Sequence, residues 1–400
     1  MEIKGVEKIK RDDLAPQVSG FGHCRLAEFL LAEGHAHLNH GAFGATPRVV
    51  LAESDRWRAI MEADPSTFFR RDLPGLLRRA AARVARFLGG RGDDWAFVEN
   101  TTAGVNAIVT SLALKPGDEI LCSSQVYGAV GNTLRYYAER AGAKVVRVHI
   151  PVPFVDPEPL FSGLRAAITT KTRLAVLEHV TSPGATVLLV QDLVAICKTA
   201  GVAVVIDGAH AIGMLPVDVP SLAADWYVGS LHKWAFSPKG TAVLWCAPER
   251  QAALHPVSIS HYLGQGFTAE FDYSGTRDNS AWVSVPVALD YIDSLGIEAM
   301  RTYNNHLAGQ AADMLAQAWK STISADARYR AAMASVKLPN SDGGDRMAGR
   351  RLAVRLAEQH RITLGVLAME GGLWVRISAQ IYNELSDYEL LAKVGGAISF

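Results

Sequence analysis

Residues 190–207, VQDLVAICKTAGVAVVID, decide which fold the sequence predicts. Residues 190–201 place apolar side chains at helical spacing and end in a glycine suited to a helix C-cap. Residues 202–207 are a short run of Val and Ile without the alternation of a half-exposed strand. A helix that leads into a strand buried on both faces is the repeating unit of a parallel α/β sheet.

The same rhythm extends through residues 90–250, where amphipathic segments such as NTLRYYAERAG (132–142) separate short apolar runs. These runs are DEILCS (118–123), AKVVRVHI (143–150), RLAVLEHV (173–180), VAVVID (202–207), DWYVG (225–229) and TAVLWC (241–246). We therefore expect a doubly wound α/β domain with a mostly parallel sheet.

The pattern changes beyond about residue 280. Segments 285–296 and 307–321 are helical, PNSDGGDR (339–346) reads as a loop, and LWVRISAQIY (373–382) reads as a strand entering a helix. We expect a smaller α+β domain here, completed by the N-terminal segment. The predicted division is 38–278 for the large domain and 1–37 with 279–400 for the small one.

Composition indicates a cytoplasmic enzyme-sized protein that binds neither nucleic acid nor membranes. The 400 residues contain 40 basic and 40 acidic side chains, and no apolar run approaches the length of a membrane span. The N-terminus is charged and lacks the apolar core of a secretory signal. Arginines in 68–87 recur at helical spacing, which predicts one solvated helix face. Cys122, Cys197 and Cys246 lie in apolar runs, which predicts buried reduced thiols.

Three polar clusters fall where strands are predicted to end, the edge at which open α/β sheets bind ligands. In the first cluster, Asn100, Thr101 and Thr102 precede an apolar-periodic helix. They either cap that helix or, in addition, hold an anion at its N-terminus.

In the second cluster, Asp207 ends a strand and His210 follows three residues later. Asp207 could cap a helix, bind a metal or pair with a positively charged ring. No third ligand stands at a convincing spacing for a metal, so we predict none.

The third cluster is YVGSLHKW (227–234), which places Ser230, His232 and Lys233 just past a strand. Alone, Lys233 reads as a solvated side chain. A strand-end lysine with a lowered pKa can instead form a Schiff base. Together the clusters supply what pyridoxal phosphate needs: an amine for its aldehyde, a carboxylate for its ring nitrogen and a phosphate site. Motifs for dinucleotides, for a P-loop and for a nucleophile elbow are absent from the sequence.

These residues resemble the class V aminotransferase family of fold-type I pyridoxal phosphate enzymes, and within it the isopenicillin N epimerase-like subgroup. The resemblance spans roughly residues 38–390 and rests on seven motifs. They are LNHGAFGATP (38–47), LPGLLRRA (73–80), HVTSPGA (179–185), VVIDGAHA (204–211), GSLHKW (229–234), SGTRDNSAW (274–282) and VRISAQIYN (375–383).

The resemblance implies a role for each cofactor residue. Lys233 would hold the cofactor and then move protons at the substrate Cα, while Asp207 would pair with the ring nitrogen. Tyr127 would stack on the ring as a further catalytic candidate, with His210 and Ser182 near the ring hydroxyl. The phosphate would be bound by Thr101, Thr102, Ser230 and His232.

The resemblance also implies substrate contacts and a partner. Arg376 would hold the carboxylate of an amino-acid substrate, and Asn39 and Phe43 would line the mouth of the site. Thr276 matches a residue that reaches the phosphate of the neighbouring subunit, which implies a homodimer.

Several reactions fit these residues. No cysteine occurs after Cys246, although family desulfurases need one in the stretch that here reads LGVLAMEGGLWVRIS (364–378). We favour C–S β-elimination from an S-substituted cysteine, which needs only the lysine as base. Epimerisation needs an acid on the opposite face, for which Tyr127 is a candidate. Transamination or decarboxylative deamination, and a non-catalytic binding module, are the remaining alternatives. The subgroup implies biosynthesis of small natural products such as antibiotics.

Overall fold

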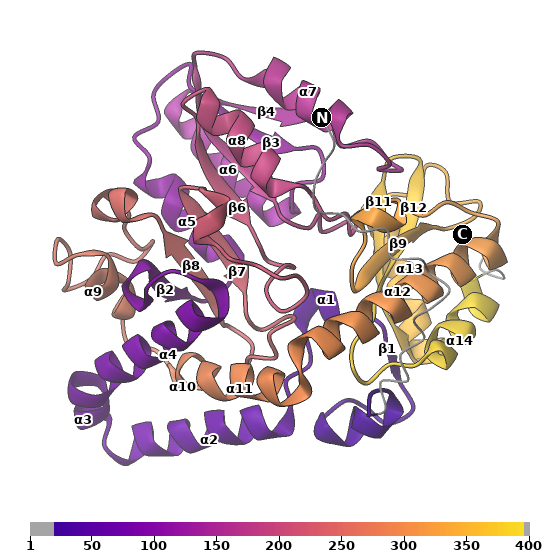
Figure 1. Ribbon diagram of the computed structural model, residues 1–400, viewed down its shortest axis with the longest axis horizontal. Helices are drawn as coiled ribbons and strands as arrows, with labels where there is room; N and C mark the ends of the chain where they lie inside the picture. The colour runs from indigo at the N-terminus through magenta and orange to yellow at the C-terminus, as the bar shows by residue number, and fades with distance from the viewer. Residues whose placement is uncertain (1–19, 396–400) are drawn as a thin grey trace.

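A seven-stranded sheet forms the centre of the larger part of the molecule (Figure 1). The computed structural model describes residues 20–395. The strand order is β2-β8-β7-β6-β5-β3-β4, and β8 alone runs antiparallel to its neighbours. The strands are β2 (Trp95–Val98), β3 (Glu119–Ser123), β4 (Lys144–Val148), β5 (Thr172–Glu178), β6 (Ala203–Asp207), β7 (Trp226–Ser230) and β8 (Ala242–Cys246). The predicted α/β fold with a mostly parallel sheet is confirmed.

Helices cover both faces of this sheet, because successive side chains of each strand point to opposite sides. One face shares a core with α4, α7, α8 and α11, and the other with α5, α6 and α9. The helices of the described chain before the small part are α1 (His40–Phe43), α2 (Arg48–Ala63), α3 (Pro65–Thr67), α4 (Leu73–Leu88), α5 (Thr101–Ser111), α6 (Gly128–Ala141), α7 (Glu158–Ala167), α8 (Val190–Thr199), α9 (Phe267–Asp272), α10 (Ser280–Val283) and α11 (Val285–Leu295).

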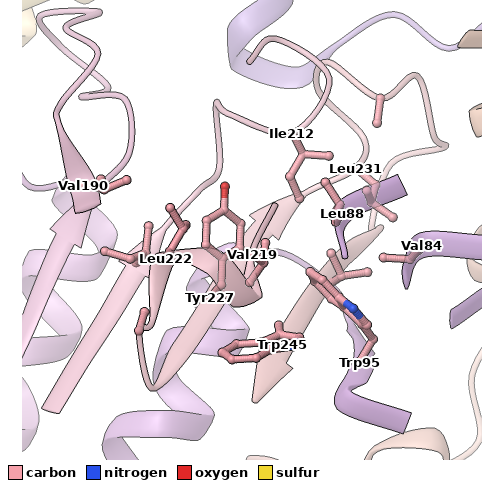
Figure 2. Packing of buried hydrophobic residues seen from close by; sticks show 14 of the residues in the cluster. Val84, Leu88, Trp95, Val190, Ile212, Val219, Leu222, Tyr227, Leu231 and Trp245 are labelled. Atoms are coloured by element: carbon pink, nitrogen blue, oxygen red, sulfur yellow. The ribbon is translucent and has the colours of Figure 1, made fainter. Parts of the chain in front are cut away.

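The larger core cluster joins α4 to the sheet. Figure 2 shows Val84 and Leu88 of α4 beside Trp95 and Trp245 of the strands. Leu88 is the last residue of α4 and is 2% exposed. Its methyl groups are therefore part of the packing that fixes α4 against the sheet.

Leu88→Ala is expected to lower the free energy of unfolding by about 2–5 kcal/mol, because it removes buried methyl groups and leaves a cavity. Urea unfolding of the purified protein measures the loss. Leu30→Ala is the matched control, since Leu30 is 63% exposed. Equal stability of the two variants would contradict this packing.

The basic segment 68–87 differs from its prediction. A π-helical turn, Phe68–Asp72, joins α3 to α4, and Arg83 of α4 is 8% exposed rather than solvated. Arg83 Nε donates to Asp290 of α11 at 2.9 Å, and its Nη2 pairs with Asp293. Helical spacing alone did not reveal that α11 supplies carboxylates to this face.

The smaller part combines two short sheets with three helices, on the right of Figure 1. An antiparallel sheet has the order β11-β12-β9, and β1 pairs in parallel with β10. These strands share one core with the helices. The elements are β1 (Ala36–His37), α12 (Ile297–Trp319), β9 (Met333–Lys337), α13 (Arg346–His360), β10 (Ile362–Thr363), β11 (Gly365–Met369), β12 (Gly372–Ser378) and α14 (Leu385–Gly395).

The division into domains stays a prediction. Residues 1–19 and 396–400, which it assigns to the small domain, lie outside the described residues. Buried side chains of α10 and α11, which follow the predicted boundary at 278, belong to the core of the large sheet. Cys122, Cys197 and Cys246 are buried and unpaired, as predicted. None of the helices within 20–395 has the length and apolarity of a bilayer span.

Candidate active site

The carboxyl ends of adjacent parallel strands enclose a cavity. Because β7, β6, β5 and β3 are neighbours in the sheet, the segments that follow them meet at one edge. The cavity there has a volume of about 390 Å³. Among its lining residues are eleven that the sequence singled out: Phe43, Asn100, Thr101, Thr102, Tyr127, Ser182, Asp207, His210, Ser230, His232 and Lys233.

Lys233 lies in the turn after β7 and presents its amine to the cavity. Its Nζ lies 3.4 Å from His210 Nε2. Burial, together with the charge of Arg376, lowers the pKa of Lys233 to about 8, although Asp207 opposes the shift. A substantial fraction of this amine is therefore neutral near physiological pH, as a nucleophile or a base must be.

Asp207 is the last residue of β6 and is 5% exposed. Its Oδ1 accepts a hydrogen bond from Ala209 N at 3.0 Å. Burial raises the pKa of Asp207, whereas this hydrogen bond and Lys233 stabilise its charged form. The next residue, Gly208, leaves no room for a larger side chain, because a Cβ there would lie 2.1 Å from the ring of Tyr227.

His210 completes the Asp207 cluster without forming a metal site. Burial and the charge of Lys233 hold its pKa well below the usual value, so the ring is neutral. Its Nδ1 is buried and has no hydrogen-bond partner in the described chain. Within 20–395, no three His, Cys, Asp or Glu side chains are grouped to hold a metal ion.

The N-terminus of α5 faces the same cavity and suits an anion. Asn100 Oδ1 caps the helix by accepting from Ala103 N at 2.9 Å. The hydroxyl oxygens of Thr101 and Ser230 lie 2.9 Å apart and so join α5 to the end of β7. Free backbone N–H groups and the helix dipole favour negative charge at this point.

His232 borders the anion site from the Lys233 turn. Its Nδ1 lies 2.8 Å from the Thr241 carbonyl oxygen, which only accepts, so Nδ1 carries a hydrogen. The Nε2 atom remains available to a ligand in the cavity that His232 lines.

Arg376 of β12 extends from the small part to the carboxyl edge of the large sheet. Its Nη1 donates to the Ser182 carbonyl at 2.7 Å and to the Ser182 hydroxyl at 3.1 Å, and its Nη2 donates to Asn39 Oδ1 at 3.4 Å. Burial lowers the pKa of Arg376 to about 10, and no carboxylate of residues 20–395 forms an ion pair with it. A buried guanidinium held only by neutral oxygens is suited to the carboxylate of a ligand.

Phe43 and Tyr127 lie at the mouth of the cavity, where they are 72% and 48% exposed. Phe43 precedes Gly44, whose φ is 70°. A Cβ on Gly44 would lie 2.1 Å from the His232 carbonyl oxygen, so only glycine allows this segment to pack on the Lys233 turn.

Thr276 lies apart from the other candidates. It belongs to the segment between α9 and α10 and lines two further hollows instead of the cavity of Lys233. Its hydroxyl lies 3.4 Å from that of Tyr273. Within one chain, the structure does not bring Thr276 to the anion site.

One lining residue was missed by the sequence reasoning. Glu178 ends β5 and is 2% exposed, and both of its carboxylate oxygens lack hydrogen-bond partners in the described chain. The signal was present, because an acidic residue closes the otherwise apolar run RLAVLEHV (173–180).

The donor set fits the cofactor that the sequence predicts. An amine, a buried carboxylate and a hydroxyl-lined helix N-terminus converge on one cavity of about 390 Å³. The unpartnered Nδ1 of His210 adds a polar atom that a bound group could satisfy. Arg376 is not among the lining residues, but it is a buried cation hydrogen-bonded to Ser182 of the lining.

Comparison with known sequences gives a family that agrees with the residues of the cavity. The family model described as aminotransferase class-V matches residues 69–391. The chain is 34% identical over 395 residues to the putative L-cysteine desulfhydrase 1 of Oryza sativa subsp. japonica, covering 90% of this chain and 82% of that protein. It is 31% identical over 382 residues to the isopenicillin N epimerase of Streptomyces clavuligerus, covering 91% and 94%.

Solved structures share the fold. The cystine C–S lyase C-DES, solved with its product cysteine persulfide, superposes with a TM-score of 0.76 at 20% identity and covers 92% of this chain and 99% of its own. The cysteine desulfurase CsdA of Escherichia coli gives a TM-score of 0.74 at 22% identity, with 92% and 95% covered. At these identities the likeness concerns the fold alone.

Proposed function

The chain belongs to the class-V aminotransferase family, and from this premise we propose that it is a pyridoxal-phosphate-dependent C–S lyase acting on cysteine or an S-substituted cysteine. Elimination from Cβ needs one base and a leaving group. Lys233 is the one lysine among the residues that line the cavity, and its lowered pKa suits a base. That observation carries the proposal, and the 34% identical desulfhydrase relative supports it.

The residues that would hold the cofactor are those of the cavity. Lys233 would bind its aldehyde carbon, Asp207 would face its ring nitrogen, and Tyr127 would cover the ring. The α5 N-terminus with Thr101 and Thr102 would bind its phosphate, with Ser230 and His232 from the Lys233 turn. Bound there, the cofactor supplies a protonated ring that accepts electrons from the substrate Cα.

Lys233 would remove the Cα proton of the substrate once its amine is free. The C–H bond at Cα and the C–S bond at Cβ break, and the thiol leaves with a proton. With one water consumed, the remaining products are pyruvate and ammonia. Arg376 would fix the substrate carboxylate so that the Cα proton points at Lys233.

Arg376→Lys is expected to raise KM for the amino acid roughly 10- to 100-fold, because an ammonium cannot reproduce two charge-assisted hydrogen bonds from one planar group. Initial-rate measurements over a range of substrate concentrations give the change. Inhibition by an alkylamine without a carboxylate is the control and should be unchanged. An unaltered KM would remove Arg376 from the substrate site.

Epimerisation is the second candidate, favoured by the 31% identical isopenicillin N epimerase. It needs a second group to return a proton to the face opposite Lys233. Tyr127 is the candidate, since it lines the cavity and is half exposed at its mouth. The variant Tyr127→Phe distinguishes the two reactions, because it should abolish epimerisation but leave elimination largely intact.

Product analysis of the cofactor-loaded protein tests the proposal. L-cysteine and S-alkyl-L-cysteines are incubated with it. Pyruvate and the leaving sulfur compound, which is hydrogen sulfide from L-cysteine and the alkanethiol from an S-alkyl-L-cysteine, are quantified against boiled protein. Equal amounts of pyruvate and the sulfur compound are expected. Accumulation of the D-amino acid without pyruvate would instead establish the epimerase.

We also propose a cytoplasmic homodimer in which Thr276 serves the neighbouring site. The support is a set of exposed apolar side chains on the segment before α9, namely Val257, Ile259, Tyr262 and Leu263, of which Tyr262 lines a hollow together with Thr276. Light scattering after size-exclusion chromatography should give twice the mass of one chain. A monomer with full activity would contradict the shared site.

A role in small-metabolite biosynthesis is also part of the proposed function.

A further inference from the structure

Asp207 has a second carboxyl group beside it. Glu178 of β5 and Asp207 of β6 are register partners on neighbouring parallel strands. Their side chains therefore point to the same face of the sheet, with strands about 4.8 Å apart. Both residues also line the cavity of Lys233. Asp207 and Glu178 are called the carboxyl pair below.

The two members of the carboxyl pair differ in their support for a negative charge. Asp207 accepts a backbone hydrogen bond from Ala209 at 3.0 Å and lies near Lys233, which stabilises its charge. Both oxygens of Glu178 are buried without a hydrogen-bond partner in residues 20–395. Burying a carboxylate without partners is costly, so Glu178 is the member that keeps a proton.

The groups around Glu178 offset only part of the cost of burying its charge. Asp207 faces it from β6, Cys122 from β3 and Arg147 from β4. Burial raises the pKa of Cys122 to about 12, so that thiol is neutral, and Arg147 is exposed to solvent. Burial, together with the charge of Asp207, raises the pKa of Glu178 to about 7, although the Ser123 hydroxyl opposes the rise.

We propose that the carboxyl pair carries a single negative charge when the cofactor is bound, with the proton on Glu178 and the charge on Asp207. The ring nitrogen needs one anionic partner, which Asp207 provides. The amine of Lys233 is then engaged by the cofactor and Arg376 is directed at the substrate. Among the described residues, the cation that acts on Glu178 is Arg147, which is exposed to solvent and does not balance a charged Glu178. Glu178 would therefore be a positioning residue that leaves Asp207 as the single anion available to the ring nitrogen.

Proton uptake on cofactor binding tests this inference. Pyridoxal phosphate is titrated into the cofactor-free full chain by calorimetry, in buffers of different ionisation enthalpy, for the parent and for Glu178→Gln. Without cofactor, Glu178 ionises as the pH rises through about 7. Above that pH, the parent should take up about one proton more per cofactor than Glu178→Gln, and the two should agree about one pH unit below it.

Glu119→Gln is the matched control. Glu119 is also a buried glutamate of the same sheet, 4% exposed, but it accepts a hydrogen bond from Thr169 and pairs with Lys144. This variant should show the proton uptake of the parent. Equal proton uptake by the parent and Glu178→Gln at every pH would overturn the inference that the carboxyl pair carries a single charge.

An infrared measurement on the loaded parent protein covers the case in which Glu178→Gln does not bind the cofactor. With glutamate labelled by carbon-13 at the side-chain carboxyl, a neutral carboxylic-acid band that shifts with the label is expected above pH 7, and its absence would overturn the inference. The inference rests on the proposed cofactor site. Failure of the parent to bind the cofactor refutes that site. Binding of the cofactor without uptake of the extra proton refutes only the inference that the carboxyl pair carries a single charge.

Discussion

Lys233→Ala is expected to reduce thiol release by at least about 10³-fold while the protein stays folded. The variant loses both the amine that attaches the cofactor and the base that removes the Cα proton, and positioned general bases alone contribute about 10²- to 10⁴-fold. Lys233 lies in a turn beyond β7, so its truncation leaves the strand ladder intact.

Two measurements check the Lys233 prediction. Borohydride reduction followed by peptide mapping should find the pyridoxyl group on Lys233 in the parent and nowhere in the variant, and initial rates give the loss. Lys171→Ala, at an exposed position before β5, is the control and should behave as the parent. Covalent labelling at another lysine with retained turnover would contradict the role of Lys233.

The pKa of Lys233 also gives a pH dependence. Because the neutral amine is the base and its pKa is lowered to about 8, turnover should fall as the pH drops through about 8 and level off above it. If the pKa of Lys233 had the ordinary lysine value of 10.5, turnover would begin to fall already below about that pH. A profile rising only near that value would therefore contradict the buried, desolvated amine.

Asp207→Asn is the second substitution with a large expected effect. The amide has nearly the same shape and can still accept the Ala209 hydrogen bond, but it carries no charge to keep the cofactor ring nitrogen protonated. We expect kcat to fall roughly 10²- to 10³-fold, the scale of losing one preorganised electrostatic contact.

Nitrogen-15 NMR of ring-labelled cofactor reports the protonation state directly, alongside initial rates. The ring nitrogen should be protonated in the parent and unprotonated in Asp207→Asn. Asp192→Asn, on the exposed side of α8, is the control. A protonated ring together with parent-like kcat in Asp207→Asn would exclude the assigned pairing.

The large sheet was predictable because its strands are buried on both faces. Such strands read as unbroken apolar runs, and all six predicted runs are strands within a few residues. The seventh, β2, spans only Trp95–Val98 and is too short to stand out. α12 begins at Ile297, ten residues before the predicted start at 307, because its first turns bury few apolar side chains.

The site was predictable where chemistry and strand ends coincide, as at Asp207 and Lys233. The hydrogen bonds of Arg376 to Ser182 and Asn39 join segments far apart in the sequence, so no local pattern could reveal them. Glu178 was missed because its importance lies in its register with Asp207, which only the sheet order defines.

Proton NMR of the cofactor-loaded protein in heavy water, with L-cysteine and S-substituted L-cysteines, tests the central claim most directly. The proposed lyase predicts loss of the substrate Cα and Cβ signals together with the appearance of pyruvate and, from the S-substituted cysteines, an equal amount of thiol. Exchange of the Cα proton with accumulation of the D-amino acid and no pyruvate would contradict it.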